Sequence, residues 1–367
     1  MKDESANLDL LRATAVTAVI VFHTLLFWDF EHVAGLSLRA LGHFGVLLFF
    51  VHTTLVLMFS LRRQQAQHPS KPLFTPFMIR RVFRIYPLSI VVVGLILLFH
   101  IPQTVLAPHS LSWTPMPASG WLLNFMLMQN LGRSPSVPGP LWSLPFEIQM
   151  YTVLPILFLA ANRARSAWTV FGVWLAATAL YGLTTLLSSS YLSELVAYAP
   201  SFIPGVIAYK LSASRRRLPF ALWPAFLGLL IASFVLGSNA APGLATPLGW
   251  LACLALGFAI PFFEELPPGQ VRQAAHLVAK YSYGVYLSHY FALWFAFMYA
   301  AAAPLALRWL IFAALVVALP VLMFHSVESP MIKLGNRVVR ALLPRLPDAA
   351  APMARSAPPL AAAAPPS

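Results

Sequence analysis

The 367-residue chain has little cysteine and little charge. Its single cysteine, Cys253, excludes a disulfide framework and a cysteine-based metal site, and we expect no bound metal. Only 10% of the residues are charged, whereas 59% are hydrophobic and the mean hydropathy is +0.75. Soluble domains carry roughly 25% charged residues and cannot hide this much apolar surface. The composition therefore excludes a soluble globular fold and predicts an all-α, polytopic membrane protein.

Apolar runs long enough to cross a bilayer, about 20 residues each, recur between residues 8 and 325. No small-x-small cleavage site follows the first run, so we expect a retained helix rather than a signal peptide. The apolar segment 121–130 is too short to span, and we predict a re-entrant or interfacial position for it. The ten predicted spans are 8–28, 41–61, 85–101, 141–161, 167–188, 195–211, 220–237, 245–263, 282–303 and 306–326.

The formal net charge of +13 does not indicate nucleic-acid binding, because the basic residues lie between apolar runs rather than on a soluble face. Ten spans with both termini in the cytoplasm place about 20 Lys and Arg on the cytoplasmic side and about three on the other. We therefore predict a multi-pass protein of the bacterial inner membrane with both termini cytoplasmic. Residues 1–342 form the predicted membrane domain, and the Pro/Ala-rich tail 343–367 is predicted to be disordered.

Ionisable residues inside spans are costly and mark functional sites. Arg12 and His23 lie eleven residues apart in the first span, close to three helical turns, so they share one face at a separation of about 16 Å. Asp9 precedes Arg12 by three residues and is predicted to pair with it. The alternative for His23 is a structural histidine held by a neighbouring carbonyl.

A second polar stripe opens the span at 141–161, where Ser143, Glu147 and Tyr151 step by four residues along one face. Glu147 is predicted to orient His23, to hold a hydroxylated acceptor or to pair with an arginine. The alternative is a structural carboxylate that pairs with a basic group of a neighbouring helix.

A third stripe consists of Ser282, Tyr286 and His289, at positions i, i+4 and i+7 of the ninth predicted span. These side chains either line a substrate site or serve packing alone, with hydroxyls bonded to neighbouring backbone. Arg81 and Arg84 stand one turn apart where a basic loop meets a span. Guanidinium pairs suit phosphates, although any cytoplasmic flank has a similar composition.

The chain resembles the acyltransferase 3 family of membrane proteins in the order of five motifs between residue 8 and about 330. Any one motif is weak, but five in order on the expected helices are specific. The motifs are Leu8-Asp9-Leu-Leu-Arg12-Ala with His23, Arg81-Val-Phe-Arg84-Ile-Tyr-Pro87, Trp142-Ser-Leu-Pro-Phe-Glu147-Ile-Gln-Met-Tyr151, Ser282-Tyr-Gly-Val-Tyr286-Leu-Ser-His289 and Glu328-Ser-Pro330.

The chain departs from this family at the second span, where members often carry Ser-Gly and this sequence has Thr53-Thr54. Thr53 keeps the hydroxyl. Thr54 replaces the glycine, which puts close helix approach at this position in doubt, because small residues are what allow helices to approach closely in lipid. The hydrolase-like domain that some members carry is absent from this sequence, so acceptor choice falls to the membrane domain or to a partner protein.

The resemblance implies transfer of an acyl group, most often from acetyl-CoA, to cell-surface carbohydrates or related acceptors. By hypothesis, Arg81 and Arg84 bind the phosphates of cytoplasmic acyl-CoA, and His23 is the general base, oriented by Glu147 or Asp9. Arg12 either stabilises the thioester oxyanion or steers the pantetheine, while Tyr286 and His289 line the acceptor end. The acceptor, whether a polysaccharide, a lipid-linked glycan or a small metabolite, and its side of entry stay open.

A transporter or flippase for a lipid-linked or hydroxylated solute is the alternative, because transporters also carry intramembrane ionisable groups. The sequence has no visible inverted repeat and no matching pair of Gly/Pro-broken spans, which argues against it. A scaffold subunit is disfavoured because scaffolds do not need buried ionisable residues.

Overall fold

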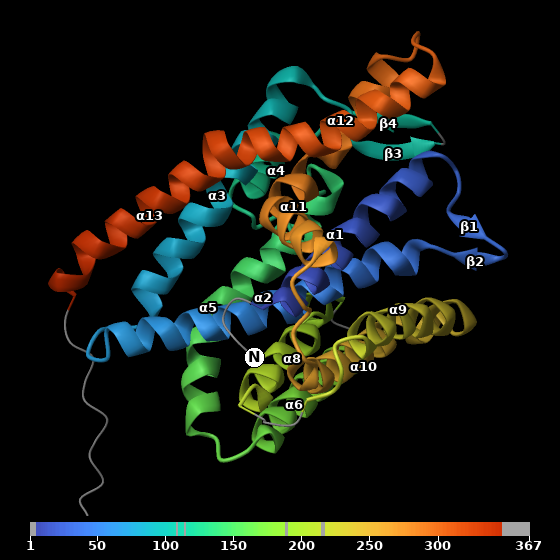
Figure 1. The fold of residues 1–367 in the computed structure, drawn as a ribbon. Helices are drawn as coiled ribbons and strands as arrows, with labels where there is room; N and C mark the ends of the chain where they lie inside the picture. Colours follow the sequence, from blue (N-terminus) through green and yellow to red (C-terminus); the bar gives the residue numbers. More distant parts are fainter. Residues whose placement is uncertain (1–4, 108, 114, 188–189, 214–216, 347–367) are drawn as a thin grey trace, which may run out of the picture.

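The computed structural model describes residues 5–107, 109–113, 115–187, 190–213 and 217–346 and is almost entirely helical (Figure 1). The α-helices are α1 (Ala6–Phe27), α2 (Arg39–Gln67), α3 (Phe74–Phe99), α4 (Ala118–Phe125), α5 (Leu144–Arg163), α6 (Ala167–Leu186), α7 (Ser190–Val196), α8 (Ala199–Leu211), α9 (Leu222–Ala240), α10 (Ala245–Ala259), α11 (Gln270–Trp294), α12 (Leu305–Met323) and α13 (Ser329–Leu342). Short 3₁₀ turns (Gly139–Ser143, Pro242–Leu244, Ile260–Phe262 and Leu343–Arg345) and π turns (Phe295–Tyr299 and Phe324–Glu328) adjoin these helices. Two small antiparallel hairpins pair β1 (His32–Val33) with β2 (Leu36–Ser37) and β3 (Thr104–Ala107) with β4 (Ser110–Ser112).

The helices confirm a polytopic all-α membrane protein. Among the described residues, nine helical segments are long and apolar enough to cross a membrane, and each overlaps a predicted span. The remaining predicted span, 282–303, falls on α11, which is long enough but carries too many polar residues to meet the same criterion. Because every residue from Ser282 to Tyr290 is buried, α11 turns this polar stretch toward the protein and not toward lipid.

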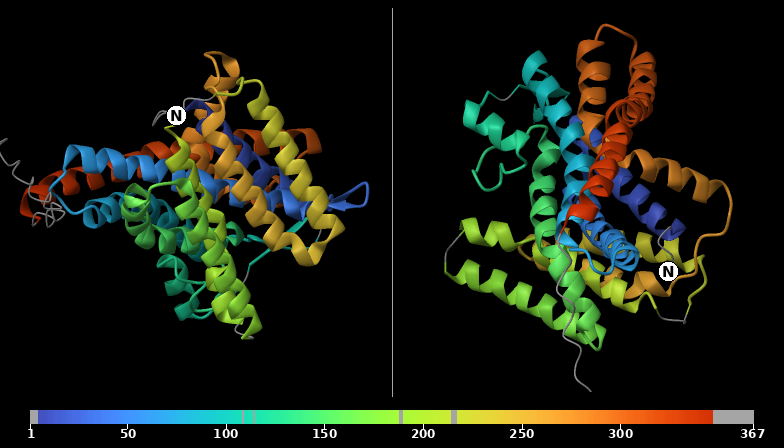
Figure 2. Two further views of the ribbon diagram at one scale, coloured as in Figure 1. Left: turned by 90° about the horizontal axis from the view of Figure 1, so that it is seen from below. Right: turned by 90° about the vertical axis from the view of Figure 1, so that its left-hand side faces the viewer.

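Figures 1 and 2 show α1, α2 and α11 at the centre of the bundle. Helices α6, α8, α9 and α10 gather on one side, and α3, α12 and α13 lie on the other. Helix α1 packs against both α2 and α11, which brings the two polar stripes of α1 and α11 face to face.

The start of α1 is fixed by hydrogen bonds to the segment before α11. Asn7 donates to the carbonyl of Glu264 at 2.8 Å and accepts from the amide of Leu266 at 3.2 Å. The hydroxyl of Ser5 donates to Glu265 at 2.9 Å and also caps α1 by accepting from the amide of Leu8. These bonds set the register between α1 and α11 on which the site depends.

Close helix approach near Thr54 is preserved by a glycine on the opposite helix. A Cβ atom on Gly205 of α8 would lie 2.6 Å from both the Thr54 Cβ and the Val51 carbonyl oxygen. The loss of glycine at position 54 therefore does not prevent close approach of the two helices, because Gly205 leaves the space on the opposite helix.

Helix α12 continues through a π turn into α13, so one helical segment runs from Leu305 to Arg345, well past the predicted end at 326. The segment predicted as too short to span contains α4, an eight-residue helix. Leu343 is buried against the helical part although a disordered tail is predicted from this residue onward. The rest of that tail, 347–367, lies outside the described residues.

Candidate functional site

Two arginines from different helices meet near one end of α1. Arg12 donates from Nε to the hydroxyl of Ser282 on α11 at 2.6 Å, and its guanidinium lies 6.0 Å from the ring centroid of Phe49. Arg84 of α3 lies 3.6 Å from the carboxylate of Glu328, which is buried in the π turn between α12 and α13. The two guanidinium groups are thus held by four different helical segments, as a buried charge requires.

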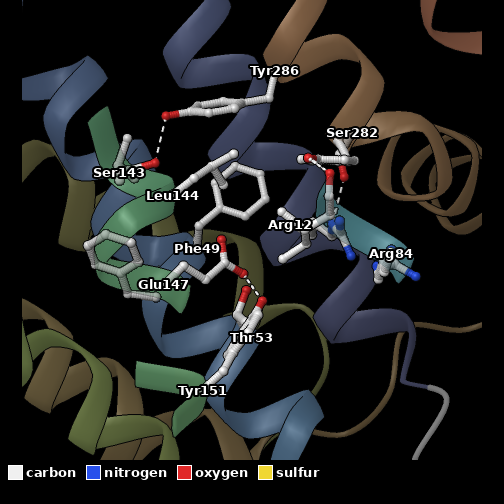
Figure 3. Close-up of a pocket in the computed structure, with 14 residues that line it drawn as sticks. Arg12, Phe49, Thr53, Arg84, Ser143, Leu144, Glu147, Tyr151, Ser282 and Tyr286 are labelled. Carbon is white, nitrogen blue, oxygen red and sulfur yellow. Dashed lines mark hydrogen bonds between the residues drawn. The ribbon is translucent and has the colours of Figure 1, made fainter. Parts of the chain in front are cut away.

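A small polar chamber lies next to these two arginines (Figure 3). This central chamber has a volume of about 60 Å³ and is lined by Arg12, Val46, Phe49, Phe50, Thr53, Arg84, Ile85, Ser143, Leu144, Glu147, Tyr151, Ser282, Tyr283 and Tyr286. The hydroxyl of Tyr151 donates to Glu147, one turn earlier on α5. Glu147 also interacts electrostatically with three arginines, so its carboxylate balances part of their charge.

Tyr286 closes the far end of the central chamber. Its hydroxyl donates to the carbonyl of Pro140, which can only accept, so the single Tyr286 proton is committed there. Ser143 must then be the donor in its 2.8 Å hydrogen bond to the Tyr286 oxygen. The Ser143 and Tyr286 side chains are therefore locked together across α5 and α11.

Beyond Tyr286, His23 of α1 meets His289 of α11 in a defined tautomeric arrangement. His289 Nδ1 lies 3.1 Å from the carbonyl oxygen of Val285, so this nitrogen carries the proton. In the neutral ring, His289 Nε2 is then an acceptor, and it lies 3.1 Å from His23 Nδ1. His23 Nδ1 must donate, which leaves His23 Nε2 unprotonated and basic.

Two larger cavities each share lining residues with the central chamber. We call the first the basal cavity; it has a volume of about 750 Å³ and is lined by Ser5, Ala6, Leu8, Asp9, Arg12, His52, Val56, Arg84, Pro268, Gly269, Arg272, Gln273, His276, Ala279, Lys280, Phe324 and Ile332. The second, the aromatic cavity, has about 400 Å³ and is lined by Val19, Phe22, His23, Leu26, Arg39, Gly42, His43, Val46, Trp142, Tyr198 and Tyr286. Arg12 and Arg84 line both the basal cavity and the chamber, and Val46 and Tyr286 line both the chamber and the aromatic cavity.

The structure thus brings the three predicted polar stripes together. Arg12, Glu147, Ser143, Tyr151, Ser282 and Tyr286 line one chamber, and His23 contacts His289. Two expected pairings are wrong. Asp9 Oδ2 lies 2.9 Å from His276 Nδ1 rather than beside Arg12, and the partner that orients His23 is His289 instead of Glu147 or Asp9.

The paired arginines of α3 occupy different surroundings. Arg84 lines two of the cavities, whereas Arg81 lines none of the three and stacks over Phe77 at 5.9 Å. Both arginines nevertheless interact electrostatically with Glu147 and with each other, so joint binding of a phosphate by Arg81 and Arg84 stays a prediction.

From the sequence, Glu328 was named only as part of a family motif, without a role, and His52 was not singled out. Glu328 is buried beside Arg84, and His52 is buried with its Nδ1 atom lacking a hydrogen-bond partner. Both are ionisable residues in or beside a membrane span, where such side chains are energetically costly. That cost is the feature by which the sequence could have identified them. His52 lies on α2 and lines the basal cavity.

Buried polar groups from α1, α2, α3, α5 and α11 around three connected cavities define a multi-pass membrane protein with an internal reaction site. The chain belongs to the acyltransferase 3 family: the family model, described as an acyltransferase domain, matches residues 5–325. It is therefore a membrane acyltransferase, and the resemblance inferred from the five motifs is confirmed. No curated protein and no solved structure matches the chain.

Proposed function

We propose that this protein transfers an acyl group, most simply acetyl, from cytoplasmic acyl-CoA to a hydroxyl of a cell-surface carbohydrate or a similar acceptor. The observation that carries the proposal is the series of three cavities, cationic at one end and aromatic at the other, with Arg12 and Arg84 at the first junction and Tyr286 at the second. The site belongs in the bacterial inner membrane, with the basal cavity open to the cytoplasm, because the basic loops flank that end.

The basal cavity suits the anionic part of acyl-CoA. Arg12 and Arg84 face it from inside, and Arg272 and Lys280 of α11 face it from the rim. Arginine and lysine bind phosphate through charge-assisted hydrogen bonds.

The chemistry takes place at the boundary that Tyr286 forms. His23 Nε2 takes the proton of the acceptor hydroxyl, and the acceptor oxygen attacks the thioester carbonyl carbon. The carbon–sulfur bond breaks, the ester forms, and the thiolate of CoA takes the proton back from His23. Atoms and charges balance without a metal ion or other co-reactant.

Arg12 serves the donor rather than the oxyanion. It lies eleven residues before His23 on the same helix, about 16 Å away, too far for both groups to contact one carbonyl. We assign Arg12 and Arg84 to binding of the donor.

The aromatic cavity suits a carbohydrate. Trp142 stacks on His43 with ring centroids 5.9 Å apart and packs against Tyr198 at 5.3 Å, which gives the cavity a flat aromatic wall. Such faces pack against the apolar C–H face of a sugar ring, while His23 lies close enough to the same cavity to reach a hydroxyl. Acceptor choice then comes from this wall or from a partner protein beside it.

The test uses the full chain in sealed proteoliposomes with radiolabelled acetyl-CoA on one side and candidate glycan acceptors on the other. Transfer of label by the wild-type protein, lost in His23→Ala at equal incorporation, supports the proposal. Label that stays in CoA while the acceptor itself crosses the bilayer contradicts it and supports the transporter alternative. The Trp168→Ala variant is the control, because Trp168 is 70% exposed on α6 and lines none of the three cavities.

A further inference from the structure

A separate basic cavity lies between α2, α3 and α13, away from the three cavities described above. It has a volume of about 350 Å³ and is lined by Ser60, Arg63, Gln64, Gln67, His68, Arg80, Asn336, Arg340 and Leu343. Three of these residues are arginines from three different helices, and no Asp or Glu lines the cavity. The concentration of guanidinium and amide donors is what an anion requires.

The walls of this cavity are held in place by hydrogen bonds and helix packing. Arg80 Nη1 donates to Gln64 at 2.7 Å, and buried Gln64 donates in turn to the carbonyl of Leu73 at 2.8 Å. Helix α13 lies close to α3, since a Cβ on Gly335 would lie 2.6 Å from Phe83. The cavity is thus built by packed helix ends and is not a chance grouping of surface side chains.

The depth of the cavity matches the phosphate layer of a bilayer. Arg80 precedes the end of α3 at Phe99 by 19 residues, and Ser60 follows the start of α2 at Arg39 by 21 residues. At about 1.5 Å per residue these lengths are about 29 and 32 Å, close to the roughly 30 Å of the hydrocarbon core. Both helices therefore place the cavity at one boundary of the hydrocarbon, where lipid phosphates lie.

We propose that this cavity is a binding site for the phosphodiester headgroup of an anionic phospholipid of the cytoplasmic leaflet. Basic pockets between helices on this side of a membrane bind such headgroups. Arg63, Arg80 and Arg340 supply the charge, and Gln67 and Asn336 supply uncharged donors for the glycerol or second phosphate. A lipid held there bridges α13 to α2 and α3. This proposal does not depend on the acyltransfer mechanism.

The experiment measures lipid retention by the purified full chain with native mass spectrometry, using phosphatidylglycerol and phosphatidylcholine as probes. The wild-type protein is expected to retain phosphatidylglycerol at least tenfold more strongly than phosphatidylcholine. Each arginine removed is expected to weaken retention about fivefold. The test variant is Arg63→Gln/Arg340→Gln. The charge-matched control is Arg62→Gln/Arg337→Gln, which changes exposed arginines on the same two helices that do not line the cavity.

Three results overturn the proposal. Equal retention of the two lipids by the wild-type protein removes the anionic preference, and equal loss in the test and control variants shows a general charge effect. Free CoA and free glycerol 3-phosphate form the third arm, because a soluble phosphate has the same recognition chemistry. If either displaces phosphatidylglycerol at equal concentration, the cavity is a soluble-phosphate site and the lipid assignment is wrong.

Discussion

Two of the polar contacts between helices α1 and α11 differ in chemistry. At one, Arg12 donates to Ser282 beside Arg84 and the basal cavity. At the other, His23 donates to His289 beside the aromatic cavity. The first contact is permanently charged because arginine does not lose its proton, whereas the second is a neutral imidazole pair.

This difference explains how one pair of helices can serve two substrates. A fixed positive charge attracts a phosphorylated donor but is a poor proton acceptor, so it suits binding. A neutral imidazole with one fixed Nδ1–H attracts no anion but accepts a proton, so it suits catalysis. The four predictions below test whether the two contacts have separate roles.

Removal of the His289 ring is expected to have the largest effect. In His289→Ala, His23 Nδ1 loses its acceptor and the basic tautomer is no longer fixed, so kcat falls about 100-fold, within the range for general base catalysis. His289→Gln restores an acceptor oxygen. Its kcat is expected to exceed that of His289→Ala by roughly fivefold or more, which is about a third of the loss on a logarithmic scale. The measurement is acetyl transfer to a glycan acceptor as a function of pH.

A purely structural role for His289 makes a different prediction. Poor packing would lower the amount of folded protein and leave the pH profile of the remaining activity unchanged. The KM for acyl-CoA is the internal control, since the His23–His289 contact lies outside the basal cavity and is expected to leave it unaltered.

Neutralising Arg84 is expected to weaken donor binding about tenfold, because a charge-assisted hydrogen bond contributes about 1.5 kcal/mol or more. Arg84→Gln alone leaves Glu328 as an unpaired buried carboxylate and destabilises the fold. The informative variant is therefore Arg84→Gln/Glu328→Gln, assayed for the KM of acetyl-CoA. Arg81→Gln is the control. An equal rise of KM in that variant would show that both arginines of the motif contact the donor.

Removing one ring of the aromatic wall is expected to have a smaller effect and to weaken only the binding of the acceptor. Trp142→Ala removes the ring that stacks on His43, and the KM for the acceptor rises about fivefold through loss of one aromatic contact. The KM for acetyl-CoA stays the same. If Trp142→Ala weakens the donor instead, the aromatic cavity is not the acceptor end and the direction of the proposed path is reversed.

The sequence predicted the helices well because apolar length is a direct physical requirement of a bilayer. It also predicted which polar side chains face inward, since lipid penalises the alternative. It did not predict the partners. Asp9 lies three residues before Arg12, but the protein pairs it with His276, far along the chain, and such contacts depend on how α1 and α11 are aligned.

The contact between Thr54 and Gly205 also could not be predicted from the sequence. Thr54 departs from the family pattern on its own helix, and only the structure shows that Gly205 of α8 faces it. A single sequence contains both residues but not the pairing of their helices. The sequence therefore predicted which residues share a face of one helix. How one helix is aligned against its neighbour could be seen only in the folded structure.

The smallest expected effect on activity, and a clear one on stability, comes from Gly205. In Gly205→Ala the new methyl group would lie 2.6 Å from the Val51 carbonyl oxygen, so α2 and α8 must separate, at a cost of about 1–3 kcal/mol. Gly172→Ala on α6 is the control, because nothing lies within 4 Å of a Cβ there and helix propensity favours alanine. Thermal unfolding in detergent measures both variants. Since Gly205 lines none of the three cavities, the properly folded Gly205→Ala protein is expected to keep its KM values. A changed donor KM with unchanged stability would instead show that the α2–α8 contact positions the site.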